Sequence, residues 1–260
     1  MKSSEILIEN GNCVIDSSSS ISEGFSCGNY CIVEKNVVIG ENCTFGHNVV
    51  IHESSKIGNG VRIDDNTVIG KQPLRSKLSI FKSNKIYEPA VIGDECLIGA
   101  GVIVYVGSEI SNNVLIADTA AVREDVKVGE FTIIGRNCTV ENFTVIGKKC
   151  KLETNSYITA YSIIEDYCFI APGVITTNDN YLGRTEERFK HFKGVTVRKG
   201  GRIGGGAVIL PGIEIGEDAV IAAGSVVTRN VPRGEIYLGL PAKKFRETPS
   251  EQLLENQNWD

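Results

Sequence analysis

Residues 128–152 read VGEFTIIGRNCTVENFTVIGKKCKL, with an aliphatic residue at every sixth position. The in-phase residues are Val128, Ile134, Val140, Ile146 and Leu152. A period of six fits neither an amphipathic helix, whose period is 3.6 residues, nor a lone alternating strand, whose period is two. It indicates a parallel β-helix, in which short strands are joined by tight turns and three hexads close one triangular coil.

The same period runs through most of the chain. The in-phase residues are Ile15, Ile21, Cys27, Val33, Ile39, Phe45, Ile51, Ile57, Ile63 and Ile69, then every sixth residue from Ile92 to Thr176, then Val197, Ile203, Ile209, Ile215, Ile221 and Val227. Each coil of a solenoid packs only against its neighbours, so 260 residues can form one domain. We expect an all-β solenoid of about ten coils over residues 1–232.

The eight cysteines follow the same register. Seven lie two residues before an in-phase position, and Cys27 is itself in phase, so all eight should point into the prism. The chain has no CxxC pair and no spacing typical of a secreted disulfide framework. The pattern predicts reduced core cysteines that behave as small hydrophobes, and no metal site.

Composition excludes several classes of protein. The net charge is −5 and the basic residues are dispersed, which argues against a nucleic-acid footprint. No apolar run is long enough to span a membrane, and the first residues lack the apolar region of a signal peptide. We therefore expect a soluble cytoplasmic protein without nucleic-acid or membrane partners.

The repeat is interrupted twice, at loop 1 (residues 71–90) and loop 2 (residues 177–196). If each loop replaces one turn, five whole coils separate their departure points, so both should leave the same edge of the prism. Long loops on a compact repeat usually carry function. Both loops combine basic residues with aromatic ones, which suits phosphates and a flat base.

The repeat, the loop Thr177-Asn178-Asp179 with a downstream Arg184, and the ending Gly239-Leu240-Pro241-Ala242-Lys243 resemble the left-handed β-helix acyltransferases. More narrowly, the chain is similar over nearly its whole length to bacterial N-acyltransferases acting on nucleotide-linked amino sugars, such as the AntD type. This resemblance implies a left-handed coil, a homotrimer with sites between neighbouring prisms, and acyl-coenzyme A as co-substrate. The implied acceptor is a dTDP- or UDP-linked dideoxyamino sugar used in polysaccharide or glycoprotein assembly.

An amine on a deoxysugar attacks a thioester directly, so the protein must orient the amine and stabilise the tetrahedral oxyanion. A carboxylate or amide near the amine would orient it and accept its proton late. For these catalytic roles we expect Asp94, Asn178, His191 and Ser83. For binding the sugar nucleotide we expect Asn84, Glu141, Asp179, Tyr181 and Arg184.

The last coils are expected to bind coenzyme A. Small residues there, Ala207, Ala223 and Gly224, let a ligand approach the backbone, and the resemblance assigns that surface to the pantetheine arm. Lys243 and Arg246 follow the final coil and would meet the phosphates. In the tail, residues 233–260, a capping-box sequence at 248–251 predicts a short helix.

Three other functions stay open. An O-acetyltransferase of the same fold would use His191 to deprotonate a hydroxyl. A protein like the γ-class carbonic anhydrases would bind zinc through His47 and His52, but it needs three imidazoles and no histidine precedes His47. A non-catalytic scaffold would not bind coenzyme A.

Overall fold

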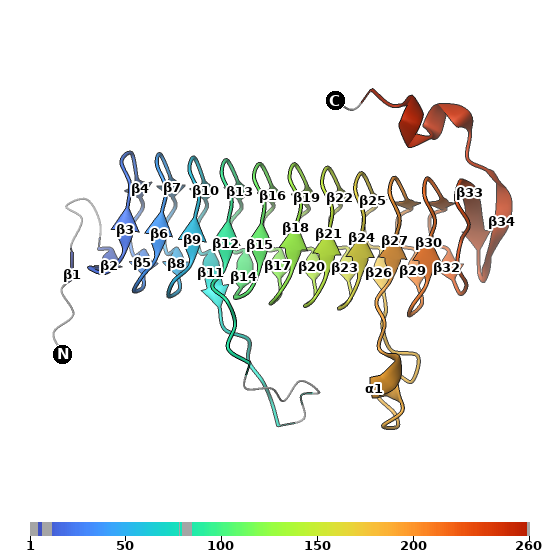
Figure 1. The fold of residues 1–260 in the computed structure, drawn as a ribbon, viewed down its shortest axis with the longest axis horizontal. Coiled ribbons are helices and arrows are strands. Elements are labelled where there is room, and N and C mark those ends of the chain that lie inside the picture. The colour runs from blue at the N-terminus through green and yellow to red at the C-terminus, as the bar shows by residue number, and fades with distance from the viewer. Residues whose placement is uncertain (1–4, 7–11, 78, 80–84, 259–260) are drawn as a thin grey trace.

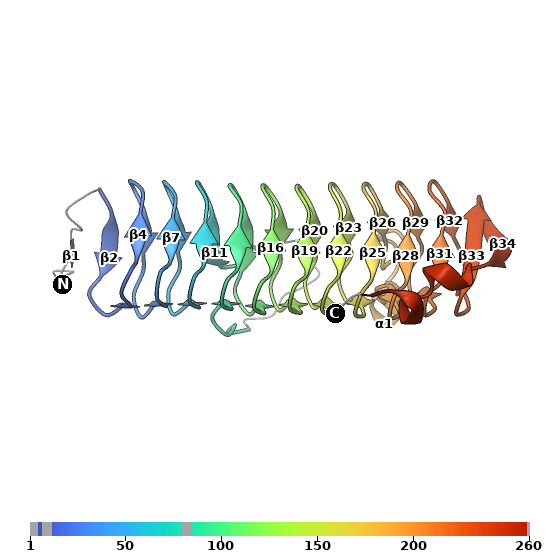
Figure 2. The same cartoon turned by 90° about the horizontal axis from the view of Figure 1, so that it is seen from above.

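The computed structural model describes residues 5–6, 12–77, 79 and 85–258, and it shows short strands wound into a three-sided solenoid (Figure 1 and Figure 2). Three sheets, called A, B and C here, form its faces, and the chain visits them in the order A, B, C in each coil. The strands pair in parallel except β1 with β2 and β33 with β34. The parallel β-helix predicted from the period of six is confirmed.

Sheet A contains, in spatial order, β1 (Glu5–Ile6), β2 (Val14–Asp16), β5 (Ile32–Val33), β8 (Val50–Ile51), β11 (Val68–Lys71), β14 (Ile103–Tyr105), β17 (Ala121–Val122), β20 (Thr139–Val140), β23 (Tyr157–Ile158), β26 (Ile175–Thr176), β29 (Val208–Ile209) and β32 (Val226–Val227). Sheet B contains β3 (Ser20–Ile21), β6 (Val38–Ile39), β9 (Lys56–Ile57), β12 (Val91–Ile92), β15 (Glu109–Ile110), β18 (Lys127–Val128), β21 (Val145–Ile146), β24 (Ile163–Ile164), β27 (Thr196–Val197) and β30 (Glu214–Ile215). Sheet C contains β4 (Ser26–Cys27), β7 (Thr44–Phe45), β10 (Arg62–Ile63), β13 (Leu97–Ile98), β16 (Leu115–Ile116), β19 (Ile133–Ile134), β22 (Lys151–Leu152), β25 (Phe169–Ile170), β28 (Arg202–Ile203), β31 (Val220–Ile221), β33 (Glu235–Gly239) and β34 (Ala242–Glu247).

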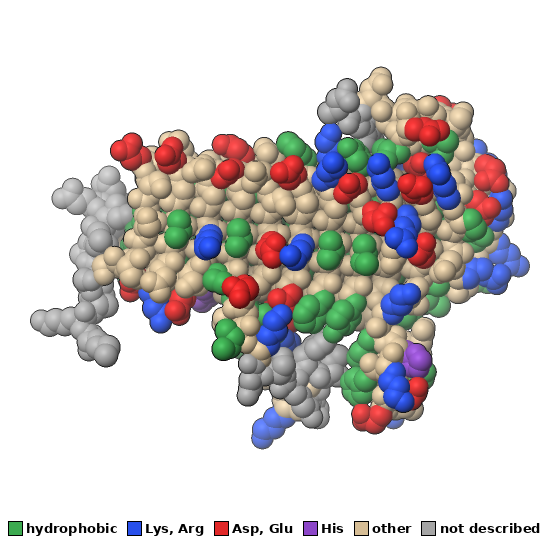
Figure 3. Space-filling model, in the orientation of Figure 1, with side chains coloured by type: hydrophobic (Ala, Val, Ile, Leu, Met, Phe, Trp, Pro, Cys, Tyr) green, Lys and Arg blue, Asp and Glu red, His purple; other side chains and the backbone are tan. Residues whose placement is uncertain are grey.

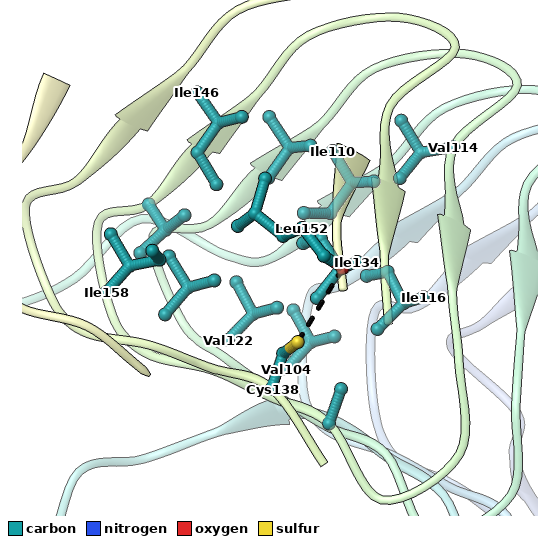
Figure 4. Close-up of a cluster of buried hydrophobic side chains, with 14 of the residues drawn as sticks. Val104, Ile110, Val114, Ile116, Val122, Ile134, Cys138, Ile146, Leu152 and Ile158 are labelled. Carbon is teal, nitrogen blue, oxygen red and sulfur yellow. Dashed lines mark hydrogen bonds between the residues drawn. The ribbon is translucent and has the colours of Figure 1, made fainter. Parts of the chain in front are cut away.

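The in-phase residues form the core because they are the second residues of nearly all these strands and point inward. Ile134, for example, pairs in register with Ile116 on one side and Leu152 on the other, and all three are fully buried (Figure 4). Seven of the eight cysteines are buried, Cys27 is half-buried, and all eight are free thiols, as the register predicts.

Asparagine suits the turns because its short side chain tolerates a left-handed backbone. The third turn residue has a φ of 55° at Asn42, 60° at Asn66 and 55° at Asn137. Four-residue turns of this kind return the chain sharply from one sheet to the next. Each hexad is therefore one two-residue strand plus one turn.

The solenoid has about twelve turns rather than about ten, because strands at both ends continue the sheets. At the C-terminal end, β33 pairs in parallel with β31, which extends sheet C beyond residue 232, and β34 folds back on β33. The predicted terminal helix occurs as two short 3-10 helices, η1 (Ser250–Gln252) and η2 (Leu254–Asn256). No capping box forms there, because the Thr248 hydroxyl donates instead to the backbone oxygen of Asp218, at 3.0 Å.

Both loops leave the solenoid where the chain passes from sheet A to sheet B, which we call the A–B edge; the B–C and C–A edges are defined likewise. Loop 1 joins β11 to β12, and loop 2 joins β26 to β27. Five coils separate β11 from β26 in sheet A, so the loops depart about 24 Å apart. The prediction that they share an edge is confirmed, and they project to the same side (Figure 1).

Helix is almost absent from the part of the chain that the structure describes. One α-helix, α1 (Arg188–His191), lies within loop 2. No described helix has the length and apolar character needed to cross a membrane.

Candidate functional site

The two loops enclose a stretch of the A–B edge that we call the inter-loop cleft. A cavity of about 180 Å³ lies on this stretch, beside loop 2. Figure 3 shows hydrophobic side chains exposed along the prism between the projecting loops. The cavity is lined by the turn and strand residues Glu141, Asn142, Tyr157, Thr159, Ala160 and Tyr161, and by the loop 2 residues Asn178, Arg188 and Phe192.

Glu141 is the carboxylate of this cavity. It follows β20 directly, and only 21% of its side chain is exposed. Burial raises the pKa of Glu141 above its usual range, and the attraction of Arg123 only partly opposes that shift. The guanidinium Nη1 of Arg123 lies 3.4 Å from its Oε2. Burial also raises the pKa of the Tyr157 hydroxyl, and the negative charge of Glu141 adds to the effect.

Two nitrogen donors near this carboxylate lack partners within the described part of the chain. Asn142 is 3% exposed, and its Nδ2 has no hydrogen-bond acceptor. The buried Nε of Arg188 also has none. Buried donors without partners are energetically unfavourable, so native structures usually satisfy them. Both residues line the cavity, where a bound ligand can supply the missing acceptors.

Loop 2 is organised around Asp179. Its carboxylate accepts hydrogen bonds from the backbone of Tyr181 and Gly183, each at 2.9 Å, and Arg188 Nη2 lies 2.8 Å from its Oδ2. Burial would raise the pKa of Asp179, but the two backbone donors and Arg188 lower it overall. The guanidinium of Arg188 in turn lies 5.0 Å from the ring centre of Phe192. Asp179 therefore holds the loop in shape and directs Arg188 toward the cavity.

The other predicted loop 2 residues occupy different places. Asn178 lines the cavity, whereas Arg184 and His191 are exposed and do not. His191 Nε2 lies 3.1 Å from Glu187 Oε1, and its ring packs 5.9 Å from that of Tyr181. The structure therefore does not bring His191 to the carboxylate of the cavity.

Loop 1 is fixed to the A–B edge by a buried carboxylate, Glu124, whose side chain is fully buried. Arg75 of loop 1 contacts its Oε1 at 2.7 Å, and Arg123 contacts its Oε2 at 2.9 Å. Arg75 also donates to the Tyr87 hydroxyl at 2.8 Å. Burial would raise the pKa of Glu124. A backbone hydrogen bond to its carboxylate and the two arginines outweigh burial, so the pKa is lowered.

A second residue of the same loop, Lys85, lies 2.7 Å from Asp125 in the turn that holds Glu124, and 5.4 Å from the ring centre of Phe143 in the next turn along the edge. The Phe143 ring stacks on Tyr161, with centres 5.2 Å apart. Loop 1 thus closes the side of the cleft opposite loop 2. The predicted residues Ser83 and Asn84 lie outside the described residues.

Asp94 lies on the B–C edge, between β12 and β13, and not on the edge that carries the loops. Its Oδ1 accepts hydrogen bonds from the backbone and side chain of Asn59, at 2.7 and 3.2 Å. Its own backbone N–H donates to Asn112 at 2.9 Å. Asp94 is thus one step in a ladder of turn residues, and the expected proximity of Asp94 to Asn178 is wrong within one protomer.

The residues expected to bind coenzyme A gather near the C–A edge. Ala207, Ala223 and Gly224 lie in successive turns from sheet C to sheet A, and Ala207 is buried. Lys243 and Arg246 are exposed on β34. Their neighbour Lys244 is paired with Glu235, at 2.6 Å, and with Glu247. This surface and the inter-loop cleft lie on opposite edges of sheet A.

The two histidines considered for zinc are also separated. His47 lies in a turn at the C–A edge, where its Nδ1 accepts a hydrogen bond from the backbone of Asn29 at 2.8 Å. His52 lies at the A–B edge beside Glu34, at 3.2 Å. Within one protomer, two imidazoles on different edges cannot bind the same metal ion.

Sequence reasoning missed Arg123, Glu124, Asn142 and Tyr157 as site residues. The sequence could have pointed to Arg123, because residues at the same turn position recur every 18 residues along one edge. Positions 105, 123, 141, 159 and 177 all directly follow an in-phase residue on sheet A, and they lead from loop 1 to loop 2.

The chain matches two related family models. Residues 36–71 match the model described as bacterial transferase hexapeptide (six repeats). Residues 89–117, 125–160 and 194–229 match the hexapeptide repeat of succinyl-transferase. The matched residues together make up just over half of the chain.

Known proteins match shorter segments. A serine acetyltransferase of Buchnera aphidicola is 44% identical over 71 residues, which are 27% of this chain and 26% of that protein. A 2,3,4,5-tetrahydropyridine-2,6-dicarboxylate N-acetyltransferase of Staphylococcus aureus is 44% identical over 50 residues, 19% of this chain and 21% of that protein. The chain therefore spans less than a third of the length of these relatives.

A solved structure extends the likeness of fold to almost the whole chain. The Arabidopsis UDP-N-acetylglucosamine acyltransferase superposes with a TM-score of 0.54 at 17% identity, and covers 96% of this chain and 77% of that one. At this identity the likeness concerns the fold alone.

Proposed function

Since this chain belongs to the bacterial hexapeptide-repeat transferase family, we propose that it transfers an acyl group from acyl-coenzyme A to the amine of a nucleotide-linked dideoxyamino sugar. The observation that carries the proposal is the inter-loop cleft, where the half-buried Glu141 lines one cavity with two nitrogen donors, Asn142 Nδ2 and Arg188 Nε, that lack acceptors among the described residues. Two relatives that match short segments are named as acetyltransferases, one of them an N-acetyltransferase. Their names agree with acyl transfer.

In the proposed reaction, the neutral amine attacks the thioester carbonyl carbon. A C–N bond forms, the carbonyl oxygen becomes an oxyanion, and the C–S bond then breaks to release the coenzyme A thiolate. Glu141 orients the amine and accepts the proton that the nitrogen loses as the amide forms. Its raised pKa suits this role, because a carboxylate of ordinary pKa is a weaker base. Buried nitrogen donors in the cavity are suited to stabilise developing negative charge.

The sugar nucleotide occupies the cleft between the loops. Tyr161 lines the cavity and stacks on Phe143, so this edge offers an aromatic surface suited to a base. Lys85 and Arg188 flank the cleft, each already paired with a carboxylate, and their other N–H groups are suited to donate to phosphates. Asn178 reaches the same cavity from loop 2 and is suited to bind the sugar.

Coenzyme A lies along the C–A edge, with its phosphates toward Lys243 and Arg246. One protomer cannot join these two parts of the site, because sheet A separates the edges. A homotrimer resolves this if the A–B edge of one subunit meets the C–A edge of the next. The outer face of sheet A supports such packing, since most of its outward side chains are apolar, including Val14 (43% exposed), Ile32 (42%) and Ile175 (44%).

The test is a reaction screen read by mass spectrometry. The purified chain is incubated with acetyl-, propionyl- or longer acyl-coenzyme A and with dTDP- and UDP-linked sugars bearing a C3 or C4 amine. Each is matched by the same sugar with a hydroxyl at that carbon. We expect an amide product with at least one amino sugar and none with its hydroxyl counterpart. Acylation of the hydroxyl sugar, abolished by His191→Ala, would favour the O-acetyltransferase. Absence of product together with no calorimetric binding of coenzyme A would contradict both.

A further inference from the structure

Three thiols converge at the N-terminal end of the solenoid, far from the inter-loop cleft. The Sγ atoms of Cys13, Cys27 and Cys31 all lie within 4.8 Å of one another, and Cys13 and Cys27 approach to 3.4 Å. Cys13 and Cys31 precede β2 and β5 of sheet A and so occupy the same position on successive coils. Cys27 reaches them from β4 of sheet C. We call these residues the thiol cluster.

This arrangement is unusual within the part of the chain that the structure describes. Among those residues, no other set of three His, Cys, Asp or Glu side chains brings its ligand atoms so close together. Cys27 also departs from the repeat, because the other in-phase positions carry Ile, Val, Leu, Phe or, once, Thr. A larger aliphatic side chain would fill that core position better than cysteine. Cys27 instead supplies the third sulfur.

The spacing matches the demand of a thiophilic metal ion. A zinc–sulfur bond is about 2.3 Å long, so sulfurs sharing a tetrahedral ion lie about 3.8 Å apart. In the thiol cluster, the Sγ atoms of Cys13 and Cys27 are 3.4 Å apart and all three Sγ atoms lie within 4.8 Å of one another, a range that includes this separation. We propose that Cys13, Cys27 and Cys31 bind one thiophilic d10 cation, Zn²⁺, as thiolates. Each thiol gives its proton to solvent as its sulfur–metal bond forms, and no atom changes oxidation state.

The surroundings of the thiols set the pH dependence of binding. Without a cation, Cys13 donates to the Gly28 oxygen at 2.9 Å and Cys31 to the Gly46 oxygen at 3.1 Å. Metal binding must displace these protons, and affinity should therefore rise with pH.

The position suggests a structural role. Terminal coils of a solenoid lack a neighbour on one side and need a cap. β3 and β4 are the first strands of sheets B and C. A metal ion bound by the thiol cluster would tie β4 of sheet C to the two adjacent coils of sheet A at this end. The bound ion should therefore stabilise the first coils without affecting the acyl-transfer site.

The experiment uses the full chain, reduced and stripped of metal by a chelator, and titrates it with Co²⁺ and then Zn²⁺. We expect a near-ultraviolet thiolate-to-cobalt band that saturates at one ion per chain and is abolished by Zn²⁺. The key variant is Cys27→Val, which restores an aliphatic residue to an in-phase position and should fold. Its matched control is Cys43→Val, since valine stands at the equivalent positions 37, 49 and 61.

The Cys27→Val variant should bind Co²⁺ at least tenfold more weakly than the wild type, and Cys43→Val should bind it equally well. Zn²⁺ should raise the Tm of the wild type and of Cys43→Val only. Absence of the cobalt band overturns the proposal. So does an equal loss of affinity in both variants. Loss of two titratable thiols in air, with no cobalt band after reduction, would identify the Cys13–Cys27 pair as a disulfide site instead.

Discussion

Replacing Glu141 by glutamine removes the proposed proton acceptor while keeping the shape of the side chain. We expect kcat to fall about 100-fold, the lower end of the range for acid–base groups, because the amine attacks without prior activation. The KM for acyl-coenzyme A should stay near the wild-type value, since we propose that this co-substrate binds along the opposite edge of sheet A. The assay measures coenzyme A release at saturating amino sugar.

The expected pH dependence of the activity follows from the environment of the Glu141 carboxylate. Only 21% of the Glu141 side chain is exposed, and burial raises its pKa, while the attraction of Arg123 at 3.4 Å partly opposes that shift. The ionised form accepts the proton, so wild-type activity should fall as pH drops through a pKa above the ordinary value of 4.5. Because glutamine does not ionise, the variant should lose the contribution of the carboxylate to this acidic limb and keep only the fall that protonation of the substrate amine causes.

The matched control is Glu34→Gln, because Glu34 occupies the same turn position on the A–B edge but precedes loop 1. It should leave kcat unchanged. A Glu141→Gln variant with kcat within threefold of the wild type would refute the assignment of Glu141. An equal loss in Glu34→Gln would show a general effect on the edge rather than chemistry.

Three further predictions separate structural from binding roles. Asp94→Ala should lower the free energy of unfolding by about 2 kcal/mol, because it removes hydrogen bonds to a charged group. It should leave kcat unchanged, and a tenfold loss of kcat would show that Asp94 takes part in the reaction. The pKa of Glu124 is lowered in the fold, so its ionic contribution is present above the ordinary pKa of 4.5 and is lost as pH falls through the lower folded value. The difference in Tm between the wild type and Glu124→Gln should therefore shrink as pH is lowered from 7 to 3, and a constant difference would contradict the ion pairs. The double variant Lys243→Ala, Arg246→Ala should raise the KM for acyl-coenzyme A about tenfold and leave the KM for the amino sugar unchanged. Initial-rate kinetics with each substrate varied in turn will test this.

The fold is predictable from the sequence because the period of six fixes the strand, its inward residue and the turn at once. In-phase residues such as Ile134 and Leu152 are buried as expected, and counting coils places both loops on one edge. The ends are less predictable, because β1 and β34 pair antiparallel and fall outside the repeat. At the C-terminus, tertiary contact with Asp218 takes the Thr248 hydroxyl that a capping box would use.

The site is predicted less well, because function depends on which of three edges a turn occupies and on the shape of the loops. Asp94 and Glu141 both lie in turns that follow an in-phase residue, two positions after Ile92 and one after Val140, yet the first turn leaves sheet B and the second leaves sheet A. The position of Asp94 could have been found by counting sheets across loop 1. The conformation of loop 2 could not have been found in this way, because loop 2 lies outside the repeat. There Asp179 takes its hydrogen-bond and ion-pair partners, Tyr181, Gly183 and Arg188, from the local fold of the loop.

We propose that the two parts of the acyl-transfer site lie on opposite edges of sheet A and meet only between subunits. Mixing two impaired variants tests it directly: Glu141→Gln, altered on the A–B edge, and Lys243→Glu with Arg246→Glu, altered near the C–A edge. In randomly mixed trimers, about a quarter of the sites should combine an intact A–B edge with an intact C–A edge. Co-refolded mixtures, assayed at low acyl-coenzyme A, should therefore recover about a quarter of wild-type activity. Activity no greater than the mean of the two separate variants would contradict a site shared between subunits.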